Sequence, residues 1–259
     1  MKKLLLAFQF LTIIPLKRMD NVSEKDVGGA SAFFPLVGTV QGILLVITSA
    51  LFLKVFPVEV SNGIILLLMI IINGGLHLDG LADTFDAIAS RKGKEKKLAI
   101  MKDSAVGPFG VIAIVFAILL KYIFLNAIFN ISLDTYYLSL FLMPIFSRWA
   151  MVTAIFHCKS ARKDGLGRIF VEHTKMTEFA AATLLTLVIS LLALFISDKT
   201  SAIISFLLIL VILYIFCIAA VRFSNKNFGG MTGDTFGAVS EISEILFLMG
   251  AMIWSQKFI

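Results

Sequence analysis

Seven long apolar stretches divide this 259-residue sequence and constrain its fold more than any other feature. They cover residues 33–53, 60–78, 107–127, 136–156, 179–197, 201–221 and 236–255. The hydrocarbon core of a bilayer is about 30 Å thick, and an α-helix needs about 20 apolar residues to cross it. Backbone polar groups inside lipid must be satisfied within the segment. We therefore expect an all-α, polytopic membrane bundle of seven transmembrane helices.

The composition supports a membrane protein, because 59% of the residues are hydrophobic and only 15% are charged. Soluble domains are about 45–50% apolar and about 25% charged. No linker rich in Pro, Gly or Ser interrupts the sequence, and no repeat of fixed period divides it. Residues 1–259 are therefore expected to form one membrane-embedded catalytic domain, surrounded by lipid and without a nucleic-acid partner.

The N-terminus resembles a signal peptide, since Lys2 and Lys3 precede an apolar stretch over residues 4–16. No small-residue cleavage site follows; the next residues are Lys17-Arg18-Met19-Asp20. We expect an uncleaved segment that lies on the membrane surface or re-enters it. The alternative is a short additional span.

Basic residues predict the orientation, because cytoplasmic loops of membrane proteins are enriched in Lys and Arg. If the seven spans alternate, 18 basic residues fall on the side of the N-terminus and the loops 79–106, 157–178 and 222–235. The opposite side carries only Lys54, Lys121, Lys199 and Lys257. The first side is therefore expected to be cytoplasmic. Two free cysteines, Cys158 and Cys217, indicate no disulfide framework.

The motif over residues 76–87 concentrates three carboxylates, Asp79, Asp83 and Asp86, beside His77. In a helix their spacing of four and three residues places them on one face, where like charges repel. A divalent cation turns that repulsion into ligation, so we expect a Mg²⁺ site. The alternative is a solvated helix end. Gly80 inside the motif is expected to let backbone approach a ligand.

A glycine-rich segment over residues 229–238 precedes the last span. Thr232 or Asp234 is expected to cap the following helix, whose first N–H groups form an anion site. Asp234 and Glu241 are seven residues apart and share a face, with Glu244 beside them. The alternative for Gly233 and Gly237 is a GxxxG helix-packing face. The candidate substrate-binding residues are His77, Arg148, Gly230, Thr232, Gly233 and Glu244.

Basic residues near these motifs are candidates for phosphate contacts, which favour Arg forks and Lys point charges. Arg91 follows the acidic motif, and Lys102 with Asp103 precedes a Gly-Pro helix entry. Arg148 is interpreted as the only basic residue well inside a span, with an acid as its expected partner. A structural salt bridge is the alternative for Arg148.

The acidic residues of all these motifs are expected at the cytoplasmic face, including Asp103, Glu241 and Glu244. Glu241 is expected one to two turns into the membrane from that face, where an unpaired carboxylate is costly. A transporter would place polar residues near the membrane midplane. Polar chemistry gathered at one surface favours an enzyme acting from the cytosol, although a transporter stays an alternative.

Several stretches together resemble the cobalamin synthase family, the adenosylcobinamide-GDP ribazoletransferases. The matching stretches are residues 8–12 with Pro15, 33–38, 76–87, 101–104 with 107–110, 147–149 and 229–234. The resemblance implies a multi-pass inner-membrane enzyme of late coenzyme B12 assembly that requires Mg²⁺. It would join adenosylcobinamide-GDP to α-ribazole, or to α-ribazole 5′-phosphate, and release GMP.

For that chemistry we expect Asp79, Asp83, Asp86 and Asp234 to hold one or two Mg²⁺ ions on the pyrophosphate. Arg91 and Lys102 would neutralise the leaving phosphate, with Asp103 beside them. Asp86 or Glu241 would accept the proton of the attacking hydroxyl. The Gly38/Gly42 pair is expected to be a helix-packing face. Both this pair and Gly233/Gly237 allow helix–helix contact, and a homo-oligomer is one form that such contact can take.

Two other membrane enzymes are alternatives. A CDP-alcohol phosphotransferase has Asp-Gly-x-x-Ala-Arg, and here Asp83 stands where its Arg belongs. An aspartate-rich prenyltransferase requires two separated Asp-rich helical motifs.

Overall fold

The computed structural model describes residues 1–16, 21–197 and 202–257. Within these ranges the regular structure is helical, apart from one isolated β-bridge between Ser160 and Met231. The predicted all-α fold is therefore confirmed. Lys17, Arg18 and Lys199, which enter the charge comparison, lie outside the described residues, as do Met19 and Asp20.

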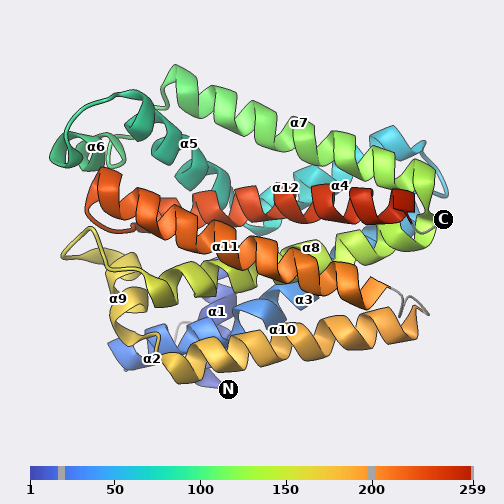
Figure 1. The fold of residues 1–259 in the computed structure, drawn as a ribbon, viewed down its shortest axis with the longest axis horizontal. Helices are drawn as coiled ribbons and strands as arrows, with labels where there is room; N and C mark the ends of the chain where they lie inside the picture. The colour runs from blue at the N-terminus through green and yellow to red at the C-terminus, as the bar shows by residue number, and fades with distance from the viewer. Residues whose placement is uncertain (17–20, 198–201, 258–259) are drawn as a thin grey trace.

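The helices follow one another with short connections (Figure 1). In chain order they are α1 (Lys2–Leu11), α2 (Glu24–Gly29), the 3-10 helix η1 (Ala30–Phe33), α3 (Phe34–Phe52), α4 (Val58–Ile72), α5 (Leu76–Ala89), α6 (Lys94–Ile100), α7 (Pro108–Ile131), α8 (Leu133–His157), α9 (Gly165–His173), α10 (Met176–Ile196), α11 (Ile203–Phe228) and α12 (Gly233–Lys257).

Six helical segments of the described chain are long and apolar enough to cross a membrane. They are Glu24–Phe52, α7, α8, α10, α11 and α12. A seventh span exists if α4 and α5, which meet at 86°, are counted as one broken span. The predicted count of seven agrees with this interpretation. The long helices run side by side, with α6 and α9 at one end and the C-terminus at the other (Figure 1).

Helix α8 forms the centre of the bundle. In its most apolar stretch of 18 residues, 94% of the residues are buried inside the protein, compared with 22–28% in the corresponding stretches of α7, α10 and α11. It packs against α3, α12, α10 and α11. Helices α7, α10 and α11 therefore present most of their apolar surface outwards, as lipid-facing helices do, whereas α8 is enclosed by protein.

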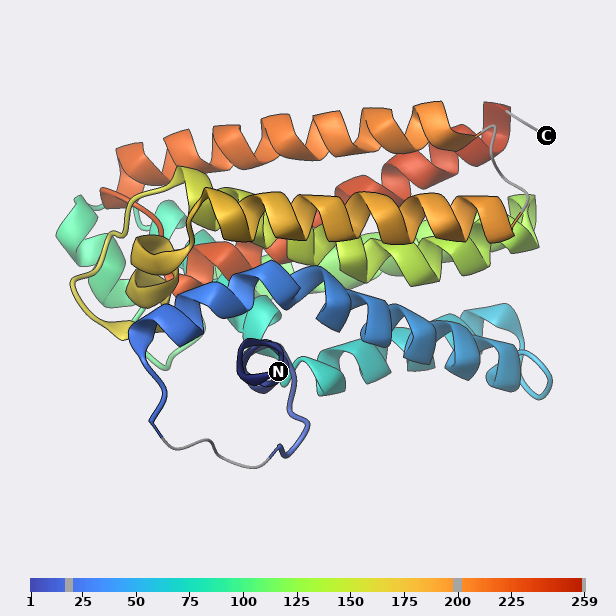
Figure 2. The ribbon, with the colours of Figure 1, turned by 90° about the horizontal axis from the view of Figure 1, so that it is seen from below.

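Helix α1 does not span the bundle. Its 10 residues extend only about 15 Å at 1.5 Å per residue. Figure 2 shows it nearly end-on, with its axis across the long helices. Phe10 packs on Phe170, with ring centroids 4.7 Å apart, and Lys2 pairs with Asp26 at 2.8 Å. The expected interfacial or re-entrant segment fits this position, and the short additional span does not.

The break between α4 and α5 corrects the expected span over residues 60–78. Helix α4 ends at Ile72, and Gly74 and Gly75 adopt φ values of 60° and 70°. Glycine occupies this left-handed region at little steric cost, so the pair ends one helix and starts the next in a new direction. The turn places the acidic motif on a separate helix, α5.

Candidate functional site

The three aspartates of the acidic motif lie on α5, as the sequence predicts. Asp79 is exposed, and Asp83 and Asp86 are half-buried. Asp83 interacts electrostatically with Asp79, Asp86 and Asp234. Asp234 comes from the first turn of α12, about 150 residues further along the chain. These four carboxylates are called the acidic site below.

Two glycines allow α5 and α12 to approach closely. A Cβ atom on Gly80 would lie 2.6 Å from the carbonyl oxygen of Asp234, and one on Gly237 would lie 3.1 Å from the Cα of His77. The backbone that approaches Gly80 is therefore that of α12, which corrects the expectation of a ligand there. The packing alternative is confirmed for Gly237. Gly233 faces open space.

Asp86 joins α5 to the N-terminus of α7. Its Oδ2 accepts a hydrogen bond from the Gly107 N–H at 2.7 Å, and its Oδ1 accepts one from the Gly110 N–H at 2.9 Å. A Cβ atom on Gly107 or Gly110 would lie within 2.6 Å of this carboxylate. Asp86 therefore satisfies two free N–H groups of α7 and favours its positive dipole end.

Asp234 has a cationic partner that the sequence analysis missed. The Arg162 Nη2 donates a hydrogen bond to Asp234 Oδ2 at 3.0 Å, and the Thr232 hydroxyl donates one at 3.2 Å. The basic loop 157–178 holds five cations, and only the tertiary structure selects Arg162 among them. The Thr232 hydroxyl also accepts from the Thr235 N–H at 3.3 Å, so Thr232 caps α12 as expected.

The glycine-rich segment lies against the loop that carries Arg162. The Met231 N–H donates to the Lys159 carbonyl at 2.8 Å, and the Ala161 N–H donates to the Met231 carbonyl at 2.9 Å. A Cβ atom on Gly230 would lie 2.5 Å from the Lys159 carbonyl oxygen. Close packing of this loop therefore requires glycine at position 230. The packed loop places Arg162 beside Asp234.

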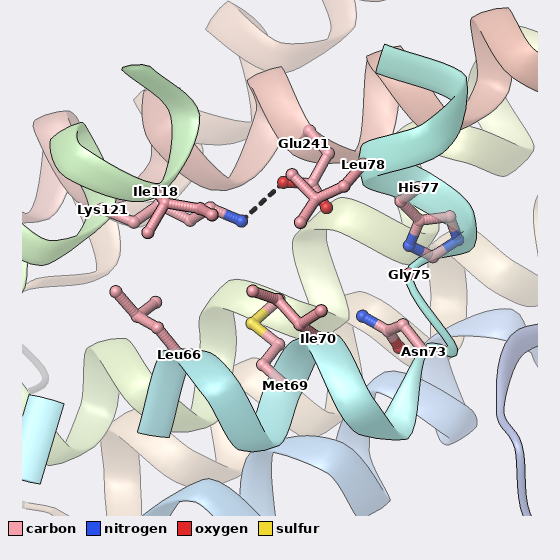
Figure 3. Close-up of a pocket in the computed structure, with 10 residues that line it drawn as sticks. All are labelled: Leu66, Met69, Ile70, Asn73, Gly75, His77, Leu78, Ile118, Lys121 and Glu241. Carbon is pink, nitrogen blue, oxygen red and sulfur yellow. Dashed lines mark hydrogen bonds and ion pairs between the residues drawn. The ribbon is translucent and has the colours of Figure 1, made fainter. Parts of the chain in front are cut away.

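Glu241 lies inside the bundle, in keeping with its expected position one to two turns into the last span, and Glu244 is buried beside it. Lys121 donates hydrogen bonds to Glu241 at 2.6 Å and to Glu244 at 2.7 Å (Figure 3 shows the first contact). All three residues are at most 3% exposed. Lys121, near the middle of α7, was expected on the opposite membrane side. The carboxylates hold it inside because an unpaired charge there is costly.

Arg148 is fully buried at the centre of α8. Its guanidinium donates to Ser240 at 2.7 Å, to Asn73 at 2.9 Å and to Gln41 at 3.0 Å, and it lies 3.9 Å from Glu244. The expected acidic partner is therefore present. Arg148 is not the only basic residue inside a span, because Lys121 is another. Its contact with Asn73 ties α8 to the break before α5.

A buried ion network, formed by Lys121, Arg148, Glu241 and Glu244, lies inside the bundle. Polar side chains are therefore found inside the bundle as well as in the acidic site. The network contains two cations and two anions, so its charges balance internally. A transporter site would need a path for substrate, whereas the cavity beside this network holds only about 10 Å³. Figure 3 shows its largely apolar lining.

The basic candidates Arg91 and Lys102, and Asp103 with them, are exposed. Arg91 follows the end of α5 with φ 53°, a conformation unusual for a residue with a side chain. Asp103 Oδ1 accepts the Ala105 N–H at 3.2 Å in the segment before α7. Within the described ranges, the ion pair of the acidic site is that of Arg162 with Asp234, and neither Arg91 nor Lys102 takes part in it.

The acidic site suits a divalent cation. Four carboxylates interact there with one guanidinium, that of Arg162, and the excess charge is negative. Mg²⁺ prefers carboxylate oxygens and keeps several waters, so one or two ligands from a half-exposed cluster suffice. A second group of potential metal ligands lies elsewhere in the described structure. It consists of Glu24, Glu172 and His173, whose ligand atoms lie within 4.8 Å of one another. Arg168 pairs with both of those glutamates and supplies the cation there.

The fold and the site together define a multi-pass helical membrane protein with an acidic site at one end of its bundle. The sequence profile of the family described as cobalamin-5-phosphate synthase matches residues 3–252. The chain belongs to this family.

Similar proteins carry the name adenosylcobinamide-GDP ribazoletransferase. One from Geotalea daltonii is 38% identical, and the match covers 97% of each chain. One from Clostridium tetani is 37% identical over 95% of this chain and 94% of its own. One from Desulfitobacterium hafniense is 36% identical over 97% of this chain and 96% of its own. No solved structure matches this chain.

Proposed function

We propose that this protein joins adenosylcobinamide-GDP to α-ribazole, or to its 5′-phosphate, and releases GMP. The products are adenosylcobalamin or its 5′-phosphate. The observation that carries the proposal is the meeting of Asp83 with Asp79 and Asp234 at one end of a membrane bundle, in a chain of this family. The basic loops gather at that end, which supports an inner-membrane enzyme whose active face is cytoplasmic.

In this reaction a hydroxyl oxygen of the ribazole attacks a phosphorus of the pyrophosphate. A new O–P bond forms, the P–O bond to GMP breaks, and the hydroxyl proton goes to a base. Catalysis of such transfers is mostly positioning and neutralisation of charge. Asp79, Asp83 and Asp234 would hold Mg²⁺, which when bound would neutralise the pyrophosphate oxygens.

Asp86 would anchor the site and supply the base in this proposal. It interacts with Asp83, whereas Glu241 is enclosed against Lys121. Of the two expected bases, Asp86 and Glu241, Asp86 fits this proposal better because it lies in the acidic site. Arg91 and Lys102 stay candidates for contacts to the leaving phosphate, because both are exposed beside α5 and α6.

The test is release of GMP by purified protein given Mg²⁺, adenosylcobinamide-GDP and α-ribazole. Asp83→Asn should lower turnover by roughly two orders of magnitude, as loss of one preorganised electrostatic contact does. The matched control, Glu95→Gln on exposed α6, should leave turnover and its Mg²⁺ dependence unchanged. The metal assignment of Asp83 fails if Asp83→Asn retains Mg²⁺-dependent turnover.

A CDP-alcohol phosphotransferase or a transporter would give a different result in the same assay. Neither releases GMP from adenosylcobinamide-GDP. Folded wild-type protein that produces no GMP would therefore overturn the proposed reaction.

A further inference from the structure

A cavity of about 240 Å³ opens beside the acidic site, between the first turns of α9 and α12. Its lining includes His77, Arg162, Gly167, Arg168, Gly233 and Asp234. The acidic site and this cavity share Asp234, so a substrate held in the cavity reaches the proposed metal. The proposed reaction assigns no substrate group to this cavity.

Two helix N-termini meet at the cavity. Helix α9 begins at Gly165, and no side chain caps it. A Cβ atom on Gly167 would lie 2.9 Å from the backbone nitrogen of Gly233, so the two helix starts are in contact. The first N–H groups of a helix lack intrahelical acceptors, and the helix dipole is positive there. Such ends bind phosphate and other anions.

Two side chains in the lining have unused donors or acceptors. His77 is 2% exposed, and its Nε2 has no hydrogen-bond partner in the described structure. The Arg162 Nε is likewise buried without a partner, although its Nη2 contacts Asp234. Both of these nitrogen atoms are enclosed by protein, so the part of Arg162 that a ligand in the cavity can reach is the end of its guanidinium, beside Asp234.

We propose that this cavity, here called the α9–α12 cavity, binds a phosphate group of a substrate through Arg162 and the two helix N-termini. The inference rests on the proposed function for the identity of the substrate. Pockets that enclose drug-sized ligands measure about 300–1,000 Å³, so this cavity takes a phosphate with its adjoining sugar and excludes the corrinoid. The phosphate belongs either to the nucleotide of the donor or to α-ribazole 5′-phosphate.

The test measures binding without turnover, using GMP and α-ribazole 5′-phosphate as separate probes of detergent-purified protein. Arg162→Gln should weaken binding of one probe at least about tenfold, because a charge-assisted contact is lost. Arg162→Lys should retain part of the affinity. The matched control is Lys163→Gln, since Lys163 is an exposed neighbour that does not line the cavity; its affinities should equal those of the wild type.

A second pair of variants serves if Arg162→Gln does not fold. Leu166 lines the cavity and is 52% exposed, so a polar residue is tolerated there. Leu166→Glu should repel the phosphate and weaken the same probe, whereas Leu166→Gln should not. Unchanged affinity for both probes in Arg162→Gln, or in Leu166→Glu where Arg162→Gln is unfolded, overturns the proposal.

Steady-state kinetics distinguish the two sources of phosphate. A donor phosphate predicts that Arg162→Gln raises the KM for adenosylcobinamide-GDP and weakens inhibition by GMP. An acceptor phosphate predicts that the preference for α-ribazole 5′-phosphate over α-ribazole is lost. If the wild-type protein releases GMP but the Arg162 variants bind both probes as tightly as the wild type does, only the proposal about the α9–α12 cavity is refuted. Wild-type protein that releases no GMP refutes the proposed function.

Discussion

Residues of one type within one motif have different environments in this protein. Both oxygens of Asp86 accept backbone N–H groups of α7, whereas Asp79 is exposed. Asp83 lies between them and faces Asp234 of α12. The three aspartates are equivalent by helical spacing, so only their neighbours separate an anchoring carboxylate from carboxylates available to a cation.

Cys158 provides a test at the residue scale. Burial raises the pKa of its thiol to about 12, and only the thiolate reacts with maleimide. At pH 8 we expect a thiolate fraction of about 10⁻⁴, and therefore labelling that is thousands of times slower than for an ordinary cysteine with a pKa of about 8.5. The labelling rate should rise about tenfold per pH unit, measured by mass spectrometry.

The control for this prediction is protein unfolded in SDS, in which Cys158 and Cys217 should both label completely. Rapid labelling of Cys158 in the folded protein at pH 8 would contradict the raised pKa of its thiol.

At the scale of elements, α5 depends on three neighbours for its position. Gly74 and Gly75 turn it away from α4, Gly80 lets it approach α12, and Asp86 attaches it to α7. Because α5 is bent by 86° relative to α4, its aspartates lie against α12. A straight continuation of α4 would have crossed the membrane instead.

The contact between Asp86 and α7 predicts a loss of stability on substitution. Asp86→Ala should cost about 0.5–2 kcal/mol, the usual effect of removing a helix cap. Gly110→Ala should also destabilise, because its Cβ would lie 2.4 Å from Asp86 Oδ2. The measurement is thermal unfolding in detergent, with Glu95→Ala on α6 as an exposed control within about 0.5 kcal/mol of wild type. An unchanged melting temperature for Asp86→Ala would exclude the capping role.

At the scale of the whole molecule, the buried ion network joins helices that are distant in sequence. Lys121 on α7 pairs with α12, and Arg148 on α8 contacts α3, α12 and the end of α4. Two basic and two acidic side chains balance one another inside the bundle. Removal of one partner therefore leaves an uncompensated charge.

Lys121→Met tests that balance. The variant should be destabilised by about 3–5 kcal/mol, because Glu241 and Glu244 lose their cation. Lys121→Met combined with Glu241→Gln restores equal numbers of charges and should unfold at a higher temperature than the single variant. A double variant no more stable than Lys121→Met would show that charge balance is not what the network supplies.

The arrangement of spans predicts where the C-terminus lies. With seven spans and a cytoplasmic N-terminus, α6 and the C-terminus lie on opposite sides of the membrane, and Figure 1 shows them at opposite ends of the bundle. Alkaline phosphatase needs the oxidising periplasm for its disulfides. A fusion after Gln256 should therefore be active and one after Lys96 inactive; the reverse result would invert the topology.

Much of the candidate site could be predicted from local sequence. The spacing of Asp79, Asp83 and Asp86 and the cap formed by Thr232 depend on neighbours within one or two helical turns. Arg162 could not be selected from sequence, because its partner Asp234 is 72 residues away. The expected position of Lys121 outside the membrane was wrong. Hydropathy alone does not show which face of α7 carries Lys121, or that two glutamates of α12 lie opposite that face.

Apolar stretches and short motifs were enough to predict a helical membrane bundle, its family and the aspartates of the proposed chemistry. These follow from apolar length, which a bilayer demands of any span, and from motifs confined to short segments. The tertiary structure alone decided that α5 turns against α12, that Asp86 anchors α7, and that Lys121, Arg148, Glu241 and Glu244 neutralise one another. Those outcomes depend on close approach and burial of residues far apart in the chain, which local spacing does not encode.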